Sequence, residues 1–242
     1  MVELAVSLAA RLGLGEREMV SLVGGGGKST LLFTLGAELA AAGKRVLLTT
    51  TTKMGREQAD WAAAICWSAE TRCAVAALNR VSPVMLVTDG DGHKVTGPTP
   101  EIVDQLYASY AADYVIVEAD GSRGMPLKAP AAHEPVIPAA TTVVVIMMGI
   151  DAVGRPLAEV THRVEEACRL TDLAVDHVMT PTDCVNVLLH EEGALRRCPA
   201  SARVIVAITK VTTDSTRIAA EELSAIIATR RPDITPVVIP VL

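Results

Sequence analysis

Aromatic side chains are nearly absent from this chain of 242 residues, in which Trp, Tyr and Phe together account for 2%. Hydrophobic residues nevertheless make up 50% of the sequence, so the core must be built mainly from Ala, Val, Leu and Ile. Aliphatic and β-branched content of this kind is typical of buried strands that helices cover on both faces. The length fits one α/β domain.

Long apolar runs are also absent. The longest strongly apolar stretch, residues 141–150, is far shorter than the roughly 20 residues that a membrane helix requires. The N-terminus carries Glu3 and has no basic region followed by an apolar run, so it does not resemble a signal peptide. We therefore expect a cytoplasmic protein without a membrane partner.

An excess of positive charge is missing as well, because the formal net charge is −6. An acidic chain is a poor binder of a polyphosphate backbone, which argues against nucleic acid as the main partner. A local basic pocket for a single nucleotide remains compatible with this charge.

Cysteine is scarce and scattered. The odd count of five and the lack of a Cys-x-x-Cys pair argue against a disulfide framework and against a zinc site. We expect reduced, mostly buried thiols of a cytosolic protein. The five are Cys66, Cys73, Cys168, Cys184 and Cys198.

What the sequence does contain is an alternation of short apolar runs with helical segments. This alternation predicts a three-layer α/β fold with a mainly parallel sheet flanked by helices. We expect one domain over residues 1–242, with a small insertion around 54–80 and a lid-like loop at 121–140. Strands are expected at residues 19–23, 45–50, 83–88, 114–117, 142–148, 203–209 and 236–239.

A glycine-rich loop joins the first expected strand to a helix expected at residues 29–42. Phosphates bind to arrays of backbone N–H groups at a helix N-terminus, and glycine lets the backbone approach them closely. Lys28 would bridge the β- and γ-phosphates, and the Ser29 hydroxyl would bind Mg²⁺. The pattern predicts a site for Mg²⁺ with ATP or GTP. Its residues are Gly24, Gly25, Gly26, Gly27, Lys28, Ser29 and Thr30.

The loop departs from the standard P-loop motif, which has a glycine where this chain has Leu22. It resembles the compact loops of the SIMIBI class of P-loop proteins. The signature lysine of the deviant members of that class would stand at Val23 and is absent.

Polar side chains follow the second expected strand. Ligands of an open parallel sheet bind at the carboxyl ends of its strands, which is where Thr51, Thr52 and Lys53 are expected. A threonine hydroxyl such as that of Thr51 could join the Mg²⁺ ligands. Lys53 could reach a γ-phosphate or an acidic co-substrate.

Two carboxylates follow the strand expected at residues 114–117. A carboxylate after an apolar strand is the usual Walker B arrangement, which binds Mg²⁺ or polarises the attacking water. Glu118 and Asp120 are two positions apart, so both could face the site as metal-binding or catalytic residues.

The lid-like loop carries further candidates. Arg123 could stabilise developing phosphate charge, and Lys128 could contribute alongside it. His133 could act as a general acid or base, or only anchor the loop. For Asp151 and the pair His162-Arg163, at another strand end, solvated or structural roles are favoured.

Several segments together resemble the YqeC family of selenium-dependent hydroxylase accessory proteins. The resemblance implies a P-loop fold and a role in maturing selenium-dependent molybdenum hydroxylases, which would be partners besides the nucleotide. The segments are residues 23–30, 49–54, Glu118-Ala119-Asp120-Gly121-Ser122-Arg123-Gly124, 126–130 and 133–138.

A late segment is similar to the Asn-Lys-x-Asp motif of many GTPases. Lys210 keeps the lysine and could lie along a base, but Thr209 and Thr212 replace the asparagine and the aspartate. Selection of GTP over ATP is therefore left open.

Three functions fit these residues. The first is an NTP hydrolase that acts as an accessory factor in assembly of a molybdenum enzyme. The second is an ATP-dependent kinase or ligase for a small molecule, in which His133 or Lys128 would handle the acceptor. The third is a scaffold gated by nucleotide without catalysis.

Overall fold

A computed structural model describes residues 6–68 and 71–240. Its main sheet has eight strands in the order β13-β12-β10-β1-β8-β2-β5-β4, and each adjacent pair is parallel. The strands are β1 (Glu18–Gly24), β2 (Val46–Thr50), β4 (Ala64–Trp67), β5 (Val84–Val87), β8 (Tyr114–Glu118), β10 (Val143–Gly149), β12 (Arg203–Thr209) and β13 (Ile234–Val238).

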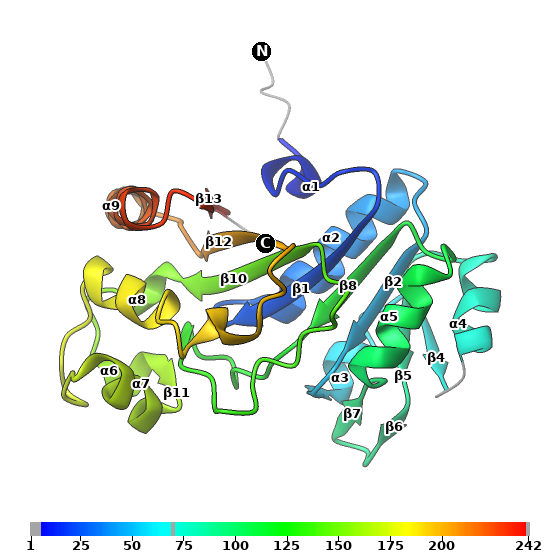
Figure 1. Cartoon of the computed structure of the whole chain (residues 1–242), viewed down its shortest axis with the longest axis horizontal. Coiled ribbons are helices and arrows are strands. Elements are labelled where there is room, and N and C mark those ends of the chain that lie inside the picture. The colour runs from blue at the N-terminus through cyan, green and yellow to red at the C-terminus, as the bar shows by residue number, and fades with distance from the viewer. Residues whose placement is uncertain (1–5, 69–70, 241–242) are drawn as a thin grey trace.

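Helices cover both faces of this sheet (Figure 1). The long helix α2 buries Leu31, Leu32 and Leu35 in one hydrophobic cluster, while α5 and α9 contribute to the other. The predicted three-layer arrangement of a mainly parallel sheet flanked by helices is confirmed. The helices are α1 (Leu8–Arg11), α2 (Lys28–Ala41), α3 (Arg56–Ala59), α4 (Thr71–Leu78), α5 (Pro100–Ala108), α6 (Leu157–Val160), α7 (Val164–Thr171), α8 (Pro181–Leu188) and α9 (Asp214–Arg230), with 3-10 turns η1 (Ile150–Ala152) and η2 (Ala194–Arg197).

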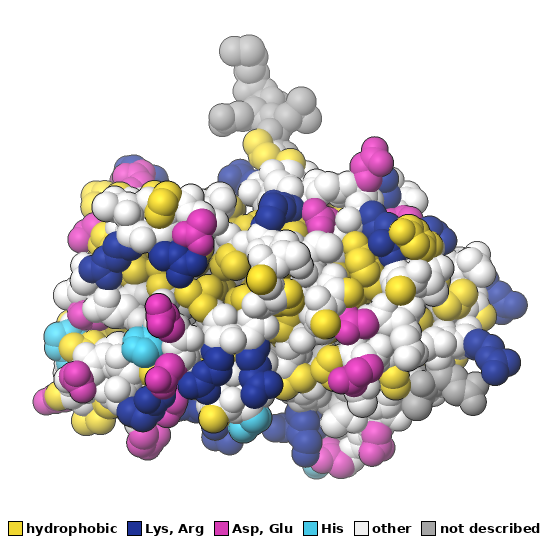
Figure 2. All heavy atoms as spheres, viewed as in Figure 1, with side chains coloured by type: hydrophobic (Ala, Val, Ile, Leu, Met, Phe, Trp, Pro, Cys, Tyr) yellow, Lys and Arg dark blue, Asp and Glu magenta, His cyan; other side chains and the backbone are white. Residues whose placement is uncertain are grey.

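The central strands explain the aliphatic composition. Every residue of β8 and β10 is buried, because helices pack on both sides of the sheet. Charged side chains of both signs are interspersed over the face seen in Figure 2, including its lower edge. None of the described helices is long and apolar enough to cross a membrane.

The strand order sets the position of the candidate site. Strand β8 lies between β1 and β2, and Glu118 at its end is in register with Leu22 on one side and Thr50 on the other. The carboxyl ends of three parallel strands therefore meet beside the glycine loop, which is where ligands bind in such sheets.

Two small sheets flank this edge. Strand β3 (Lys53–Gly55) pairs with β7 (Lys94–Thr96), which pairs with β6 (Asp89–Gly90), all antiparallel. Strands β9 (Leu127–Lys128) and β11 (Thr161–His162) form a parallel pair. Within the segment expected as an insertion, β3 belongs to the first small sheet and α3 packs against that sheet, whereas β4 extends the main sheet.

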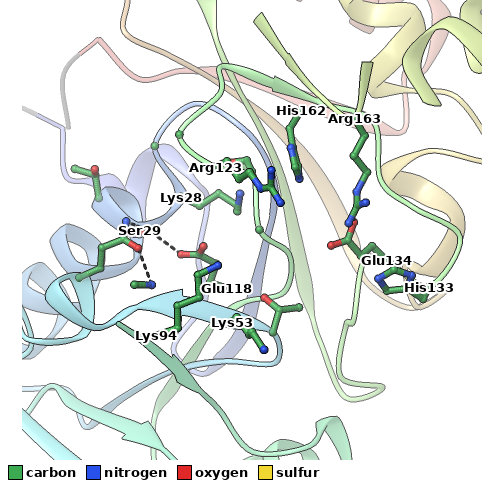
Figure 3. Close-up of a pocket in the computed structure, with 18 of the residues that line it drawn as sticks. Lys28, Ser29, Lys53, Lys94, Glu118, Arg123, His133, Glu134, His162 and Arg163 are labelled. Carbon is green, nitrogen blue, oxygen red and sulfur yellow. Dashed lines mark hydrogen bonds and ion pairs between the residues drawn. The ribbon is translucent and has the colours of Figure 1, made fainter. Parts of the chain in front are cut away.

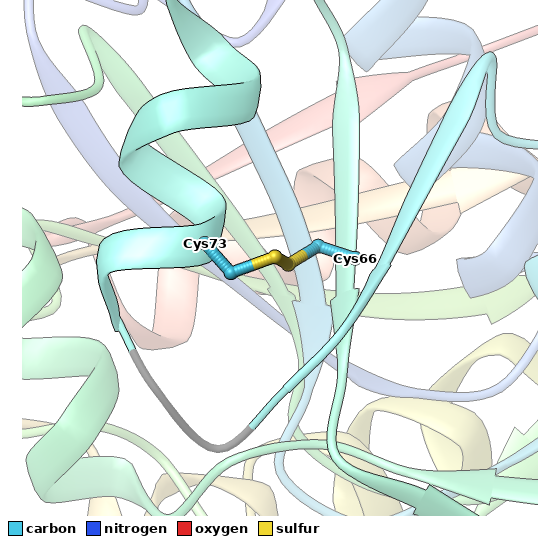
Figure 4. The surroundings of a disulfide bond; sticks show 2 residues. All are labelled: Cys66 and Cys73. Carbon is cyan, nitrogen blue, oxygen red and sulfur yellow. A yellow bond between two sulfur atoms is a disulfide. The ribbon is translucent and has the colours of Figure 1, made fainter.

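The expectation that all cysteines are reduced is wrong. Cys66 on β4 and Cys73 on α4 form a disulfide with a Cα–Cα distance of 6.5 Å (Figure 4). Helix α4 packs against β4, and this packing brings the two thiols together. The count and spacing of cysteines carry no information on such packing. Of the free cysteines, Cys184 is buried, and burial raises the pKa of its thiol to about 12.

Candidate functional site

The glycine loop forms a cup between the end of β1 and the start of α2. Gly24, Gly26 and Gly27 have φ angles of 92°, 74° and 107°, in the left-handed region that favours glycine. A Cβ atom on Gly26 would lie 2.1 Å from the backbone nitrogen of Gly149, and one on Gly25 would lie 2.5 Å from the Met125 carbonyl oxygen. The loop therefore needs glycine both for its backbone shape and for its contact with neighbouring backbone.

The cup opens into a cavity of about 800 Å³. Pockets of this size are typical of small-molecule and cofactor sites. Several elements distant in sequence contribute to its walls (Figure 3). The lining residues are Gly27, Lys28, Ser29, Thr30, Thr52, Lys53, Gly55, Gln58, Lys94, Glu118, Gly121, Ser122, Arg123, Gly124, His133, Glu134, His162, Arg163 and Lys210.

Ser29 and Glu118 face each other at the start of α2. The Ser29 hydroxyl donates to Glu118 Oε2 at 2.8 Å, and Gln58 Nε2 donates to Ser29 Oγ at 3.1 Å. Burial raises the pKa of Glu118, while the charge of Lys28 opposes that rise. A hydroxyl beside a carboxylate is an oxygen-donor pair suited to Mg²⁺, which proteins bind through one or two carboxylates together with substrate phosphates.

Lys28 lies inside the cup and is only 3% exposed. Its Nζ donates to the Gly24 carbonyl oxygen at 2.5 Å and lies 3.2 Å from Asp120 Oδ1. Asp120 in turn accepts from the Gly24 backbone nitrogen at 3.1 Å. In this state the lysine is therefore held at the wall of the cavity by the loop and by a carboxylate.

The structure corrects the expectation that Asp120 faces the site together with Glu118. Asp120 is 1% exposed and does not line the cavity. The argument from alternating side chains fails because β8 ends at Glu118, so the strand geometry does not extend to Asp120. Asp120 contacts the glycine loop and two lysines instead of open space.

Of the threonines after β2, only Thr52 lines the cavity. The Thr51 hydroxyl donates to the Val136 carbonyl oxygen at 2.6 Å and so fastens the loop at 121–140, and a metal-binding role for Thr51 stays a prediction. Lys53 lines the cavity on β3, and Lys94, which sequence reasoning missed, lines it from the paired strand β7.

Arg123 and His133 from the loop at 121–140 line the cavity as expected, but Lys128 does not. His162 and Arg163 do line it, contrary to the solvated or structural roles favoured for them. They reach the cavity because β11 pairs with β9, a contact between segments that no local pattern predicts.

Lys210 lines the cavity at the end of β12, and its Nζ lies 2.8 Å from Asp151 Oδ2. Thr209 is buried, and its hydroxyl donates to the Gly26 carbonyl oxygen at 2.5 Å. Thr209 therefore supports the glycine loop, and Lys210 is the residue of this segment that reaches the cavity.

We expect His162 to be neutral at pH 7. Burial lowers the pKa of His162 below its usual 6.5, as do the charges of Lys128, Arg163 and Arg123, with Glu134 opposing them. Because the unfolded chain binds this proton more readily, stability should fall as the pH drops from about 6.5 towards the folded pKa. NMR titration should place the pKa of His162 below 6.5 and should raise it in Arg163→Gln; a value at or above 6.5 in the unsubstituted protein would contradict the assignment.

A parallel α/β sheet whose first strand runs through a glycine cup into a helix that begins Lys-Ser-Thr defines a P-loop protein. The family described as YqeC protein matches residues 20–165 of the chain. The YqeC protein of Escherichia coli K12 is 35% identical over 219 residues, which cover 90% of this chain and 86% of that protein. The chain belongs to the YqeC family.

Solved structures with a similar arrangement include hydrogenase maturation factor HypB from Archaeoglobus fulgidus. It is 10% identical with a TM-score of 0.48, and the match covers 95% of this chain and 84% of HypB. HypB from Helicobacter pylori, solved in complex with nickel, is 12% identical with a TM-score of 0.39, covering 92% of this chain and 78% of that one.

Proposed function

We propose that this protein binds a Mg²⁺–nucleoside triphosphate on the glycine cup and hydrolyses it. The observation that carries the proposal is the hydrogen bond between Ser29 and Glu118, at the start of α2 and within the cavity. It joins the serine of the P-loop motif to the carboxylate of the neighbouring strand β8, as a Mg²⁺ site for phosphoryl chemistry requires.

The residues of the cup have distinct roles in this proposal. The backbone N–H groups at the N-terminus of α2 would face the phosphates, and Lys28 would contribute a positive charge to them. The N–H groups of Gly24, Gly25 and Gly26 instead hold the shape of the cup, because they donate to Asp120 and to the Met147 and Met125 carbonyl oxygens. For Lys28 to reach a γ-phosphate, it must exchange its contact with Asp120 for one with the phosphate. Bound Mg²⁺ neutralises charge on the β- and γ-phosphates, and Ser29 and Glu118 would hold it.

Hydrolysis would depend on residues around the position of the γ-phosphate. Glu118 would orient water, directly or through its Mg²⁺ role, and Gln58 adds an amide that contacts Ser29. Arg123 lines the same cavity and would stabilise charge on the transferred phosphoryl group. Thr30, Thr52 and Lys53 complete the phosphate side of the site.

The base would lie near Lys210, whose alkyl chain offers an apolar surface at the end of β12. Thr209 and Thr212 lack the carboxylate that reads guanine, and the Asp151 side chain is paired with Lys210. Both ATP and GTP therefore remain candidates, and a thermal-shift panel of nucleotides with and without Mg²⁺ decides between them.

The cellular role that we propose is that of a cytoplasmic accessory factor in maturation of a selenium-dependent molybdenum hydroxylase. The support for this role is the sequence resemblance carried by residues 118–124 and the segments that follow them. The disulfide between Cys66 and Cys73 removes the cysteine argument for the cytosol, so the assignment to the cytoplasm depends on the supply of nucleotide there.

Glu118→Gln should separate nucleotide binding from hydrolysis. We expect Mg²⁺-dependent hydrolysis to fall at least about 100-fold, while affinity for the nucleotide measured without Mg²⁺ changes by less than about threefold, because the lost carboxylate acts on water and metal. Phosphate release and equilibrium binding of a fluorescent nucleotide measure the two effects.

The matched control is Glu159→Gln, at an exposed carboxylate on α6 that pairs only with Arg155. It should leave both quantities unchanged. Equal hydrolysis in Glu118→Gln and the unsubstituted protein would refute the role of Glu118. Tight binding without any turnover, in the presence of the partner hydroxylase as well, would favour the nucleotide-gated scaffold.

A further inference from the structure

The cavity extends beyond the glycine cup to a second cationic wall. Arg123, His162 and Arg163 line this wall, and Figure 3 shows Arg123 between Lys28 and the pair His162 and Arg163. Arg123 comes from the loop at 121–140, whereas His162 and Arg163 come from β11 and the turn before α7. Ser29 on α2 lies across the cavity from His162 and Arg163, so a triphosphate held by the cup and Ser29 would leave room for a second ligand at this wall.

Positive charge in the cavity exceeds what the acidic groups around it neutralise. The lining contains six basic residues, Lys28, Lys53, Lys94, Arg123, Arg163 and Lys210, and two carboxylates, Glu118 and Glu134. Two further carboxylates pair with lining lysines from outside the lining, Asp120 with Lys28 and Asp151 with Lys210. The side chain of Arg123 makes no hydrogen bond or ion pair with any of residues 6–68 and 71–240. Such an excess in a chain of net charge −6 favours binding of anions at this place.

Arg163 is anchored in a way that leaves its outer nitrogens available. Its Nε lies 3.2 Å from Glu134 Oε2, and within the described part of the chain neither Nη atom has a hydrogen-bond partner. Two parallel N–H groups of a guanidinium are the donor arrangement that binds carboxylate and phosphate oxygens.

A buried chain of alternating charges fixes Glu134, and through it Arg163. Lys128 Nζ lies 3.0 Å from Glu134 Oε2 and 3.1 Å from Asp120 Oδ2, and Asp120 contacts Lys28. Burial alone would raise the pKa of Glu134, but Lys128 and Arg163 outweigh it and lower the pKa, so Glu134 stays ionised. The network prepares Arg163 for a ligand in the same way that outer hydrogen-bond partners orient metal ligands.

Three non-glycine residues that line the cavity have strained backbone conformations. The φ angles of Arg123, Arg163 and Lys210 are 52°, 66° and 62°, in the left-handed region that non-glycine residues rarely adopt. Such conformations persist where surrounding structure enforces them, and they cluster at ligand sites.

We propose that Arg123, His162 and Arg163 form a second subsite that binds a small co-substrate through an oxyanion group, phosphate or carboxylate, next to the γ-phosphate position. The proposal rests on the proposed nucleotide function, since it gives that site a second ligand. The two guanidinium groups bind the oxygens, and a neutral His162 can donate one further hydrogen bond. His133 is exposed and also lines the cavity.

The test uses full-length protein saturated with Mg²⁺ and a non-hydrolysable triphosphate, so that the glycine cup is filled. Inorganic phosphate, molybdate and acetate are titrated separately at constant ionic strength, with chloride as the control, and binding is followed by calorimetry and by the shift in Tm. We expect saturable binding of at least one oxyanion. Tight binding of phosphate or molybdate points to a free inorganic oxyanion or a phosphoryl group, and preference for acetate points to a carboxylate.

Arg163→Gln should weaken that binding at least tenfold while nucleotide affinity stays within about threefold. The matched control is Arg155→Gln, an exposed arginine that pairs with Glu159 and does not line the cavity. His162→Asn gives a second variant in case Arg163→Gln fails to fold. Absence of saturable binding for all three probes, or equal binding in Arg163→Gln, would overturn the subsite.

A second set of titrations distinguishes failure of the subsite from failure of the proposed nucleotide binding. If no nucleotide binds, the same titrations are made on Lys28→Ala without nucleotide, in which the cup lacks its lysine. Oxyanion binding that persists there and is lost in Lys28→Ala/Arg163→Gln supports the subsite while the nucleotide proposal falls. Binding that is lost in Lys28→Ala alone places the anion in the cup and overturns the subsite.

Discussion

Replacing Lys28 with alanine should reduce affinity for Mg²⁺-nucleotide by at least about 100-fold. A lysine that bonds two phosphates makes charge-assisted hydrogen bonds, and loss of roughly 2.7 kcal/mol of such binding corresponds to this factor. The Tm of Lys28→Ala should therefore no longer respond to nucleotide concentrations that stabilise the unsubstituted protein. Affinity within threefold of the unsubstituted value would remove the basis of the proposed function.

The variant must be shown to fold, because Lys28 is also part of a buried ion pair. Without it, Asp120 keeps Lys128 at 3.1 Å and the Gly24 N–H, so we expect a cost of about 1–3 kcal/mol in unfolding free energy and a folded protein. Circular dichroism and denaturant unfolding without nucleotide measure that cost. Lys44→Ala is the matched control, because Lys44 follows α2 and does not line the cavity, and it should retain the nucleotide affinity of the unsubstituted protein.

The elements of the fold are predictable from sequence because local patterns determine them. The apolar run before the glycines becomes β1, and the leucines at helical spacing after Lys28 become the buried face of α2. The order of the strands is not local. The sequence of β8 does not indicate that this strand lies between β1 and β2. That position allows Glu118 to accept a hydrogen bond from Ser29.

The residues of the cavity likewise divide into those that local motifs predict and those that only the tertiary structure places. Lys28, Ser29 and Glu118 follow from motifs in which spacing along the chain fixes position in space. Gln58 and Arg163 enter through pairings between distant segments, β3 with β7 and β9 with β11, and their own neighbours in the sequence give no sign of it.

The contacts of Thr51 and Asp120 have equally specific causes. Thr51 lies at the end of a strand beside the site, and its hydroxyl donates to Val136, whose carbonyl belongs to a loop that the sequence could not place. Strand alternation extended two residues past Glu118 would put Asp120 at the cavity, but the strand ends at Glu118. A residue's chemistry is readable from sequence, whereas the atom it contacts depends on the tertiary path of the chain.

Gly26→Ala should be the most disruptive single substitution in the glycine cup. The new Cβ would lie 2.1 Å from the Gly149 backbone nitrogen and 2.4 Å from the Met148 carbonyl carbon, and the φ of 74° adds strain. The obstructing atoms are backbone at the end of the central strand β10, so they cannot turn away as a flexible side chain would. We expect roughly 2–4 kcal/mol of lost stability, together with loss of nucleotide binding.

Gly121→Ala is the matched control for this prediction. Gly121 lines the same cavity, but a Cβ there would meet no atom within 4 Å, and its φ is outside the left-handed region. Its unfolding free energy should change by less than about 1 kcal/mol, and its nucleotide affinity should be preserved. Denaturant unfolding of the two variants beside the unsubstituted protein measures the contrast. Equal stabilities for Gly26→Ala and Gly121→Ala would mean that the cup can move away from β10, and the close packing that shapes the phosphate site would then not be required.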